Sequence, residues 1–285
     1  MDFLRPSTWD EALAAKAAHP DAVPIAGGTD VMVELNFDRR RPPALLDLTR
    51  VAPLTEWGTD GDLLRVGAGV SYRRIIEELG SRLPGLAMAS RTVGSPQIRN
   101  RGTVGGNLGS ASPAGDAHPP LLAAGALVEL ASVRGVRRVP VDGFFRGPKR
   151  SVLEPDELIA GFLVRPGGAQ QFAKVGTRNA MVIAVCSFAL SLSLETRSVG
   201  TGIGSAAPTP LRATEAEEFL SRELDWEARG PVPPSVAQRF GELVAAAASP
   251  IDDVRGTAAY RSHALSVLAR RTLAWAWKGF REVGP

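Results

Sequence analysis

Two short glycine-rich segments contain residues that could bind a phosphate group through the main chain. They are AGGTD at residues 26–30 and GTVGGN at residues 102–107, and in each we expect a strand to run into the glycines. Consecutive backbone N–H groups without surrounding side chains form a concavity that binds anions. Thr29-Asp30 also opens a predicted helix, whose N-terminus adds positive potential. The pair predicts two loops that clasp a phosphate-bearing ligand, although either loop alone is also explained as a plain glycine turn.

The acidic residue after the second loop has two interpretations. Asp116 lies in PAGDAHPPLLAAGA, directly before a predicted helix. Its side chain could cap that helix, or it could bind the ligand of the glycine loops. The local sequence favours neither interpretation over the other.

Other phosphate motifs are excluded by their spacing. VGAGVSY begins like the dinucleotide fingerprint, but Tyr72 stands where the third Gly or Ala should be. Gly67 and Gly69 are therefore expected to form a tight turn from a strand to a helix. Neither glycine loop is followed by a lysine at the spacing of a P-loop.

The composition is typical of a soluble globular protein and excludes several functions. Of the 285 residues, 44% are hydrophobic and 22% are charged, and a net charge of only +3 predicts no nucleic-acid binding. The longest apolar run, MVIAVCSFALSLSL, is too short and too rich in serine to span a bilayer. MDFLRPSTWD has no signal-peptide pattern, and the chain has a single cysteine, so we expect a cytoplasmic protein. The three histidines lie in unrelated contexts, which predicts no metal site.

The elements that must hold the loops alternate between strands and helices. PSTWDEALAAKAAH predicts a helix with Ser7 as its N-cap and Asp10 in a capping-box-like position. SYRRIIEELG predicts a second helix, capped by Ser71. Strands are predicted in PDELIAGFLVRP and on both sides of a polar loop around Arg178-Asn179, and amphipathic helices follow, the last of them the longest.

Several side chains outside the loops have a structural interpretation. Cys186 lies in an apolar strand, which favours a buried, inert thiol. His118 is expected to start a helix or to lie at the surface, and Trp275 and Trp277 are expected in the core. The basic run RGVRRVPVDGFFRGPKR at residues 134–150 favours a solvated face over a docking site for an acidic partner.

The second loop is part of a longer motif that resembles a known family. IRNRGTVGGNLGSASPAGD, residues 98–116, resembles the signature of the FAD-binding medium subunit of molybdenum hydroxylases. That family includes the carbon monoxide dehydrogenase flavoprotein and the flavin domain of xanthine dehydrogenase. The likeness covers nearly the whole chain: FLRPSTWDEAL resembles the family's opening, FAKVGTR a middle signature and DVRGTAAYRSHALSVLARRTL the C-terminal domain.

The resemblance implies an α+β fold in three parts and a set of cofactor contacts. Residues 1–55 and 56–165 are expected to form the two α/β subdomains of a PCMH-type FAD-binding fold, and residues 166–285 a C-terminal α+β domain with a small antiparallel sheet and helices. Among the contacts, Asp116 is expected near the sugar chain and Ile183 near the flavin ring, on a loop that can gate access. By position, the residues that hold FAD without a covalent bond are Ala26, Gly27, Gly28, Thr29, Asp30, Thr103, Gly105, Gly106, Asn107, Asp116, Leu158, Lys174 and Ile183.

The resemblance also implies an FAD-dependent oxidoreductase that is one subunit of a complex. An iron–sulfur cluster needs four thiolates, and this chain has one cysteine. A partner iron–sulfur subunit is therefore expected to pass electrons to the flavin, and a molybdopterin subunit to oxidise the substrate. NAD+, oxygen or a quinone then receives the electrons, and no side chain of this chain acts as a catalytic acid or base.

Two alternatives remain at this point. The first is a free-standing FAD-dependent oxidase or oxygenase that acts directly on a small molecule. The second is a protein that keeps the fold but not the flavin, against which the intact glycines and Asn107 argue. Some relatives carry acidic residues where this chain has Ala180, Met181 and Val182, so the resemblance does not fix the electron acceptor.

Overall fold

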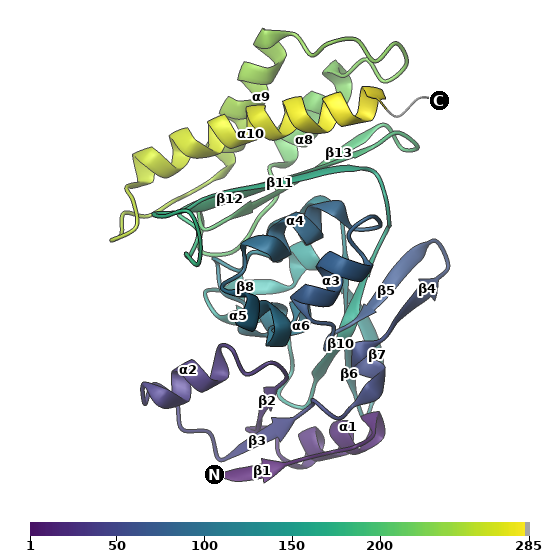
Figure 1. Cartoon of the computed structure of the whole chain (residues 1–285), viewed down its shortest axis with the longest axis vertical. Helices are drawn as coiled ribbons and strands as arrows, with labels where there is room; N and C mark the ends of the chain where they lie inside the picture. Colours follow the sequence, from purple (N-terminus) through teal and green to yellow (C-terminus); the bar gives the residue numbers. More distant parts are fainter. Residues whose placement is uncertain (283–285) are drawn as a thin grey trace.

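The computed structural model describes residues 1–282, which form three parts arranged one after another along the long axis (Figure 1). The first part contains a parallel sheet in the order β1-β3-β2. All four residues of β3 are buried, as expected for the central strand of a covered parallel sheet. Its elements are β1 (Asp2–Leu4), α1 (Trp9–Ala18), β2 (Val23–Ile25), α2 (Val31–Asn36) and β3 (Ala44–Asp47), followed by the short η1 (Ala52–Thr55).

The first helix is capped one residue later than predicted. Thr8 is the N-cap of α1: its Oγ1 accepts the N–H of Glu11 at 3.2 Å, and Glu11 Oε2 accepts the N–H of Thr8 at 3.3 Å. The predicted pair Ser7 and Asp10 is therefore wrong. The reciprocal cap needs a Glu or Gln at the third helical position, and Glu11 also accepts the N–H and hydroxyl of Ser7 at 2.8 and 2.9 Å.

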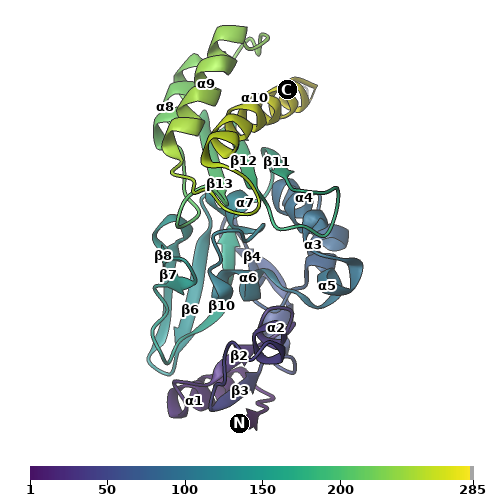
Figure 2. The same cartoon turned by 90° about the vertical axis from the view of Figure 1, so that its left-hand side faces the viewer.

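The second part is built on an antiparallel sheet in the order β4-β5-β10-β6-β7. Figure 2 shows α3, α4 and α5 on one side of this part, with β6, β7 and β8 on the other. The strands are β4 (Trp57–Asp60), β5 (Leu63–Gly67), β6 (Leu127–Ser132), β7 (Gly135–Pro140) and β10 (Leu158–Val164), with the small pair β8 (Phe145–Gly147) and β9 (Arg150–Ser151). The helices are α3 (Tyr72–Glu78), α4 (Pro84–Thr92), α5 (Pro96–Arg101), α6 (Val104–Ser110), α7 (His118–Ala123) and the short η2 (Val141–Gly143).

The turn from β5 to α3 has the tight geometry that its glycines predict. An ideal Cβ on Gly67 would lie 2.3 Å from the carbonyl oxygen of Leu54, so only glycine fits there. Ser71 is the N-cap of α3, as predicted, and its Oγ accepts the N–H of Arg74 at 3.3 Å. This turn matters for the site because the second glycine loop packs against it.

The third part is an antiparallel sheet, in the order β11-β12-β13, covered by the long last helix (Figure 1). Cys186 is buried in β12, and burial raises the pKa of its thiol to about 12, which confirms the inert thiol. Trp277 is 3% exposed and stacks on Phe280, whereas Trp275 is 48% exposed, so the core prediction is correct only for Trp277. The elements are β11 (Ala169–Val175), β12 (Cys186–Ser193), β13 (Ser198–Gly204), α8 (Thr214–Glu223), α9 (Pro234–Ala247) and α10 (Ala258–Glu282).

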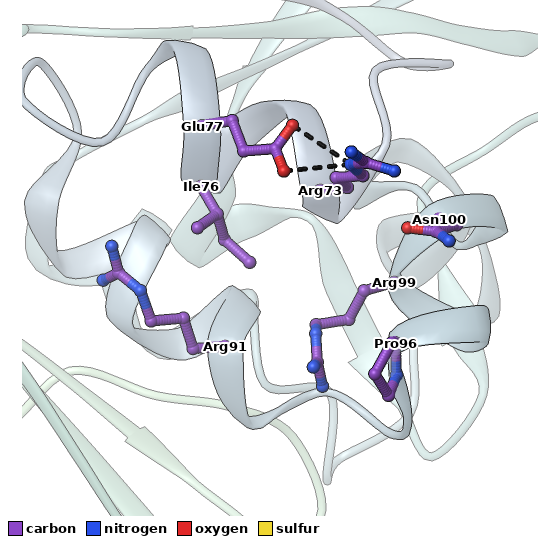
Figure 3. A pocket seen from close by; sticks show the side chains of 7 residues that line it. All are labelled: Arg73, Ile76, Glu77, Arg91, Pro96, Arg99 and Asn100. Carbon is purple, nitrogen blue, oxygen red and sulfur yellow. Dashed lines mark hydrogen bonds and ion pairs between the residues drawn. The ribbon is translucent and has the colours of Figure 1, made fainter.

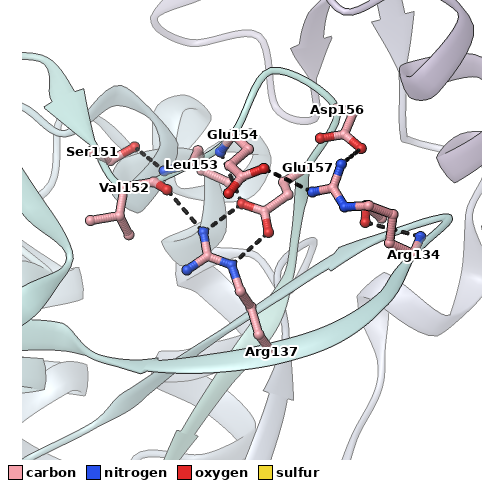
Figure 4. Close-up of polar contacts among 9 residues, drawn as sticks. Arg134, Arg137, Ser151, Val152, Leu153, Glu154, Asp156 and Glu157 are labelled. Atoms are coloured by element: carbon pink, nitrogen blue, oxygen red, sulfur yellow. Dashed lines mark hydrogen bonds and ion pairs between the residues drawn. The ribbon is translucent and has the colours of Figure 1, made fainter.

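Acidic residues from other segments neutralise much of the basic run at residues 134–150 (Figure 4). Arg137 pairs with the buried Glu157 at 2.6 Å, and Arg134 binds both Glu154 and Asp156. These ion pairs remove the main reason to expect an acidic partner on this face. The other pairs are Arg138 with Asp60 and Glu129, and Lys149 with Glu34.

The described residues, 1–282, contain neither a membrane-spanning helix nor a metal-binding cluster. None of their helices is long and apolar enough to cross a membrane. Likewise, within that range no three or more His, Cys, Asp or Glu side chains are grouped so that they could hold a metal ion.

Candidate functional site

The two glycine loops lie against each other, although α2, β3, β4, β5 and the helices α3 to α5 lie between them in the chain. An ideal Cβ on Gly27 would lie 2.0 Å from the carbonyl oxygen of Arg101 and 2.9 Å from the nitrogen of Gly102. Any side chain at Gly27 would therefore push the loops apart. The structure brings residues 26–30 and 102–107 together into one site.

The glycines of the two loops have different roles. Gly28 has φ +73°, a left-handed conformation that favours glycine. An ideal Cβ on Gly105 would lie 2.4 Å from the Cβ of Ala68, so Gly105 allows α6 to pack on the turn after β5. Gly106 is exposed, and the nearest atom to its ideal Cβ is the Thr103 Oγ1 at 3.1 Å. A side chain at Gly106 would project outward, into the space that a ligand of the loop would use.

The backbone of the first loop offers hydrogen-bond donors. In the described part of the chain, the N–H groups of Gly27, Gly28 and Thr29 have no hydrogen-bond acceptor. Asp30 is the N-cap of α2 but makes no side-chain cap. Such a run of free amides is the arrangement that binds a phosphate oxygen.

The second loop differs from the prediction in the element that leads into it. A helix, α5, precedes it, where a strand was predicted. The prediction relied on the glycines and overlooked two residues that favour the start of a helix. Ser95 is the N-cap of α5, and Pro96 is its first residue. Thr103 then caps α6, its Oγ1 accepting the N–H of Gly106 at 2.9 Å, and its hydroxyl hydrogen remains available as a donor.

Asp116 is held by the third part of the molecule. Its Oδ2 accepts from Lys174 Nζ on β11 at 2.6 Å and from Thr92 Oγ1 at 3.3 Å. The side chains of Lys174 and Asp116 are 6% and 10% exposed. Burial raises the pKa of Asp116 above its ordinary value of 3.8, and the Lys174 ammonium opposes that rise. The capping interpretation of Asp116 is wrong, because Ala117 is the N-cap of α7 and no side chain caps that helix.

One oxygen of Asp116 has no partner. Oδ1 is buried and accepts no hydrogen bond from any described residue. An unpaired buried acceptor is costly, and each one calls for an explanation. A hydroxyl group of a bound ligand is a fitting donor for it.

Asn107 is fixed by its neighbours on α7. Its Oδ1 accepts the N–H of Ala117 at 3.2 Å, and its carbonyl oxygen lies 3.0 Å from Nε2 of His118. His118 starts α7, as predicted, but it is fully buried, so the surface interpretation is wrong. Burial lowers the pKa of His118 to about 4, and hydrogen bonds to the main chain of Asn107 and Ser112 oppose that shift.

Tyr72 is a residue of this region that the sequence did not indicate. It is 3% exposed, its N–H donates to the Gly102 carbonyl at 3.0 Å, and its ring lies under Gly102. Burial raises the pKa of Tyr72 well above 10.0, and the carboxylates of Asp116 and Asp30 add to the rise. The phenol is therefore neutral, and no spacing rule would have revealed it, because its position results from the packing of α3 on the loop.

Two further predicted contacts, Leu158 and Ile183, belong to neither glycine loop. Leu158 on β10 is 2% exposed and belongs to the buried cluster that joins the first part to the second. Ile183 is 52% exposed on the loop between β11 and β12. That loop is folded on itself: Arg178 Nε donates to the carbonyl oxygens of Ala180 and Met181, each at 3.1 Å. The contacts of Leu158 and Ile183 with a cofactor stay predictions.

These features suit a class of protein that binds a phosphate-bearing ligand beside two touching loops. Comparison with known families identifies which one. Residues 1–164 match the FAD-binding domain in molybdopterin dehydrogenase, and residues 171–276 match the CO dehydrogenase flavoprotein C-terminal domain. The chain belongs to this family of FAD-binding proteins, which confirms the resemblance and the cofactor.

Individual relatives match over nearly their full length. The chain is 30% identical over 284 residues to the xanthine dehydrogenase FAD-binding subunit of Escherichia coli O157:H7, covering 95% of this chain and 94% of that protein. It is 31% identical over 283 residues to the nicotine 6-hydroxylase medium subunit of Paenarthrobacter nicotinovorans, covering 95% of each. The crystal structure of quinoline 2-oxidoreductase from Pseudomonas putida 86 matches with a TM-score of 0.88 and 26% identity, over 98% of this chain and 97% of that chain.

The residues present fit FAD. The free amides of the first loop and the open side of Gly106 suit a pyrophosphate, which needs donors and no side chains in its way. The unpaired Oδ1 of Asp116 suits a hydroxyl of the cofactor's sugar chain. The contacts of the individual loop residues with FAD stay predictions.

Proposed function

We propose that this chain is the electron-relaying FAD subunit of a molybdenum hydroxylase complex. A partner iron–sulfur subunit supplies electrons, a molybdopterin subunit oxidises the organic substrate, and NAD+, oxygen or a quinone is the final acceptor. The observation that carries the proposal is the contact between the two glycine loops at Gly27 and Arg101. This contact supports a single ligand position, next to the free amides of residues 27–29 and the open position at Gly106.

The side chains of this protein would hold and orient FAD. The amides of residues 27–29 and the open position at Gly106 would hold the pyrophosphate, and Asp116, fixed by Lys174, would accept from the sugar chain. Bound FAD supplies one- and two-electron transfer, which the protein's own side chains cannot perform. We assign no general acid or base, because Cys186 and His118 are both buried and neutral.

We also propose the boundaries of the three parts and the location of the complex. The divisions near residues 55 and 165 fall between the first and second sheets and between the second and third. A cytoplasmic location is proposed because the single cysteine makes no disulfide. The free-standing oxidase is not favoured, since relatives matched over nearly their full length are named as subunits.

Reconstitution tests the proposal. The purified chain should take up FAD and show flavin absorbance, and the substrate of the complex should bleach that absorbance only when the iron–sulfur and molybdopterin subunits are present. The Gly106→Val variant, assembled with the same partners, is the control, because it should form the complex without the flavin signal. If the chain alone were to oxidise a small organic molecule, the free-standing oxidase would replace this proposal.

A further inference from the structure

A pocket lined in part by charged residues lies between α3, α4 and α5, outside the glycine loops (Figure 3). Its volume is about 370 Å³, within the range of about 300–1,000 Å³ that is common for small-molecule sites. The charged side chains that line it are Arg73 and Glu77 from α3, Arg91 from α4 and Arg99 from α5. Three arginines and one glutamate therefore line a single hollow.

The positive charge in the pocket exceeds the negative charge. Arg73 is paired with Glu77, its Nε lying 2.9 and 3.1 Å from the two carboxylate oxygens. Arg91 is exposed and makes no hydrogen bond or ion pair with any described residue. Together with Arg99, this leaves two positive charges without a carboxylate. The network around Arg134 and Arg137 differs, because there each guanidinium has its own acidic partner (Figure 4).

Arg99 is anchored in a way that leaves part of its guanidinium available. Its Nη1 donates to the carbonyl oxygens of Val93 and Gly94 at 3.1 and 3.0 Å, at the end of α4. Nε and Nη2 of Arg99 make no hydrogen bond within the described residues. Asn100, which also lines the pocket, adds a side-chain amide that can donate. The anchored Arg99 and the unpaired Arg91 thus line the same pocket.

We propose that this pocket binds a phosphate-bearing small molecule, at a site separate from the FAD loops. A phosphate monoester carries about −1.5 to −2 charges at neutral pH, which matches the two unbalanced arginines. The planar fork of donors on arginine suits phosphate oxygens in two-point hydrogen bonds. The inference does not depend on the proposed electron relay, although α5 connects the two sites through Arg101 and Gly102.

Calorimetric titration with ADP tests the pocket while FAD occupies the loops. The protein saturated with FAD should bind ADP at one site, inorganic phosphate should compete, adenosine should not bind, and added KCl should weaken the affinity. Arg91→Gln should lower the affinity for ADP about tenfold, the loss expected for one charge-assisted contact. Arg222→Gln, which removes an exposed arginine of α8 far from the pocket, should leave the affinity unchanged.

The arms of the experiment separate this proposal from the proposed function. If saturation with FAD or the Gly106→Val substitution abolished ADP binding while Arg91→Gln did not weaken it, ADP would be using the glycine loops and the pocket proposal would fail. Absence of ADP binding to the FAD-saturated protein would overturn it as well. If the chain took up no FAD but its ADP binding still depended on Arg91, the pocket proposal would be supported and the proposed electron-relay function would be contradicted. If Arg91→Gln changes the unfolding midpoint, its loss of affinity could come from altered folding. Arg73→Gln is the second variant for that case.

Discussion

Replacing Lys174 by methionine should destabilise the protein most at neutral pH and least in acid. In the wild type, Lys174 Nζ lies 2.6 Å from Asp116 Oδ2, and both side chains are nearly inaccessible to water. Lys174→Met leaves that carboxylate buried with only the Thr92 hydroxyl at 3.3 Å as a donor. Breaking a buried pair in this way costs about 3 kcal/mol, roughly a hundredfold in the folded-to-unfolded ratio.

The pH dependence follows from the pKa of Asp116. Burial already raises the pKa of this carboxyl in the wild type, and Lys174 lowers it. Without Lys174, the folded-state pKa of Asp116 moves further above the unfolded value. The folded state of the variant then favours a neutral Asp116 carboxyl. The variant is therefore most stable at low pH, and it loses stability as the pH rises through the folded-state pKa of Asp116. The deficit of Lys174→Met should therefore shrink as the solution is acidified.

Denaturant unfolding at a series of pH values measures this effect. The double variant Lys174→Met/Asp116→Asn removes both charges, so at neutral pH it should recover to within about 1 kcal/mol of the wild type. A Lys174→Met deficit that neither changed with pH nor was relieved by Asp116→Asn would refute the reasoning. In that case the destabilisation would come from lost packing on β11.

The remaining predictions concern the loops and two buried groups. Gly106→Val should lose FAD, as measured by flavin absorbance, while its free energy of unfolding stays unchanged. Gly105→Ala should instead lower the free energy of unfolding by about 1–3 kcal/mol, because the added Cβ would overlap Ala68. Because the pKa of Cys186 is raised to about 12, iodoacetamide should label it only on unfolding. Because the pKa of His118 is lowered from 6.5 to about 4, NMR should find its ring neutral at pH 6. The unfolded chain takes up that proton first, so stability should fall by about 3 kcal/mol as the pH drops from 6.5 to 4, and His118→Leu should flatten this decline.

The sequence predicted the features that depend on neighbours in the chain. The cap at Ser71, the tight turn at Gly67 and the helix that follows Asp30 all result from local backbone rules, and the structure has them. The error at the second loop was also local, since Ser95-Pro96 signalled a helix that the glycines obscured. Local backbone rules therefore predicted most of the elements. They did not decide between a helix start and a glycine turn where both patterns occur close together.

The features that the sequence missed depend on partners far along the chain. Asp116 was left between two roles because its partner, Lys174, lies 58 residues further on, in β11 of the third part. The carboxylates that neutralise the basic run likewise come from other segments, as Glu157 does for Arg137. Tyr72 has its role only because α3 packs under Gly102. Such contacts appear only once the three parts are assembled.

A crystal structure of the chain with FAD would test the central claim most directly. The account predicts pyrophosphate oxygens within hydrogen-bond distance of the amides of residues 27–29 and of the second loop beside Gly106, with a sugar-chain hydroxyl donating to Oδ1 of Asp116. FAD bound elsewhere on the protein, or with its pyrophosphate facing side chains instead of these amides, would contradict it.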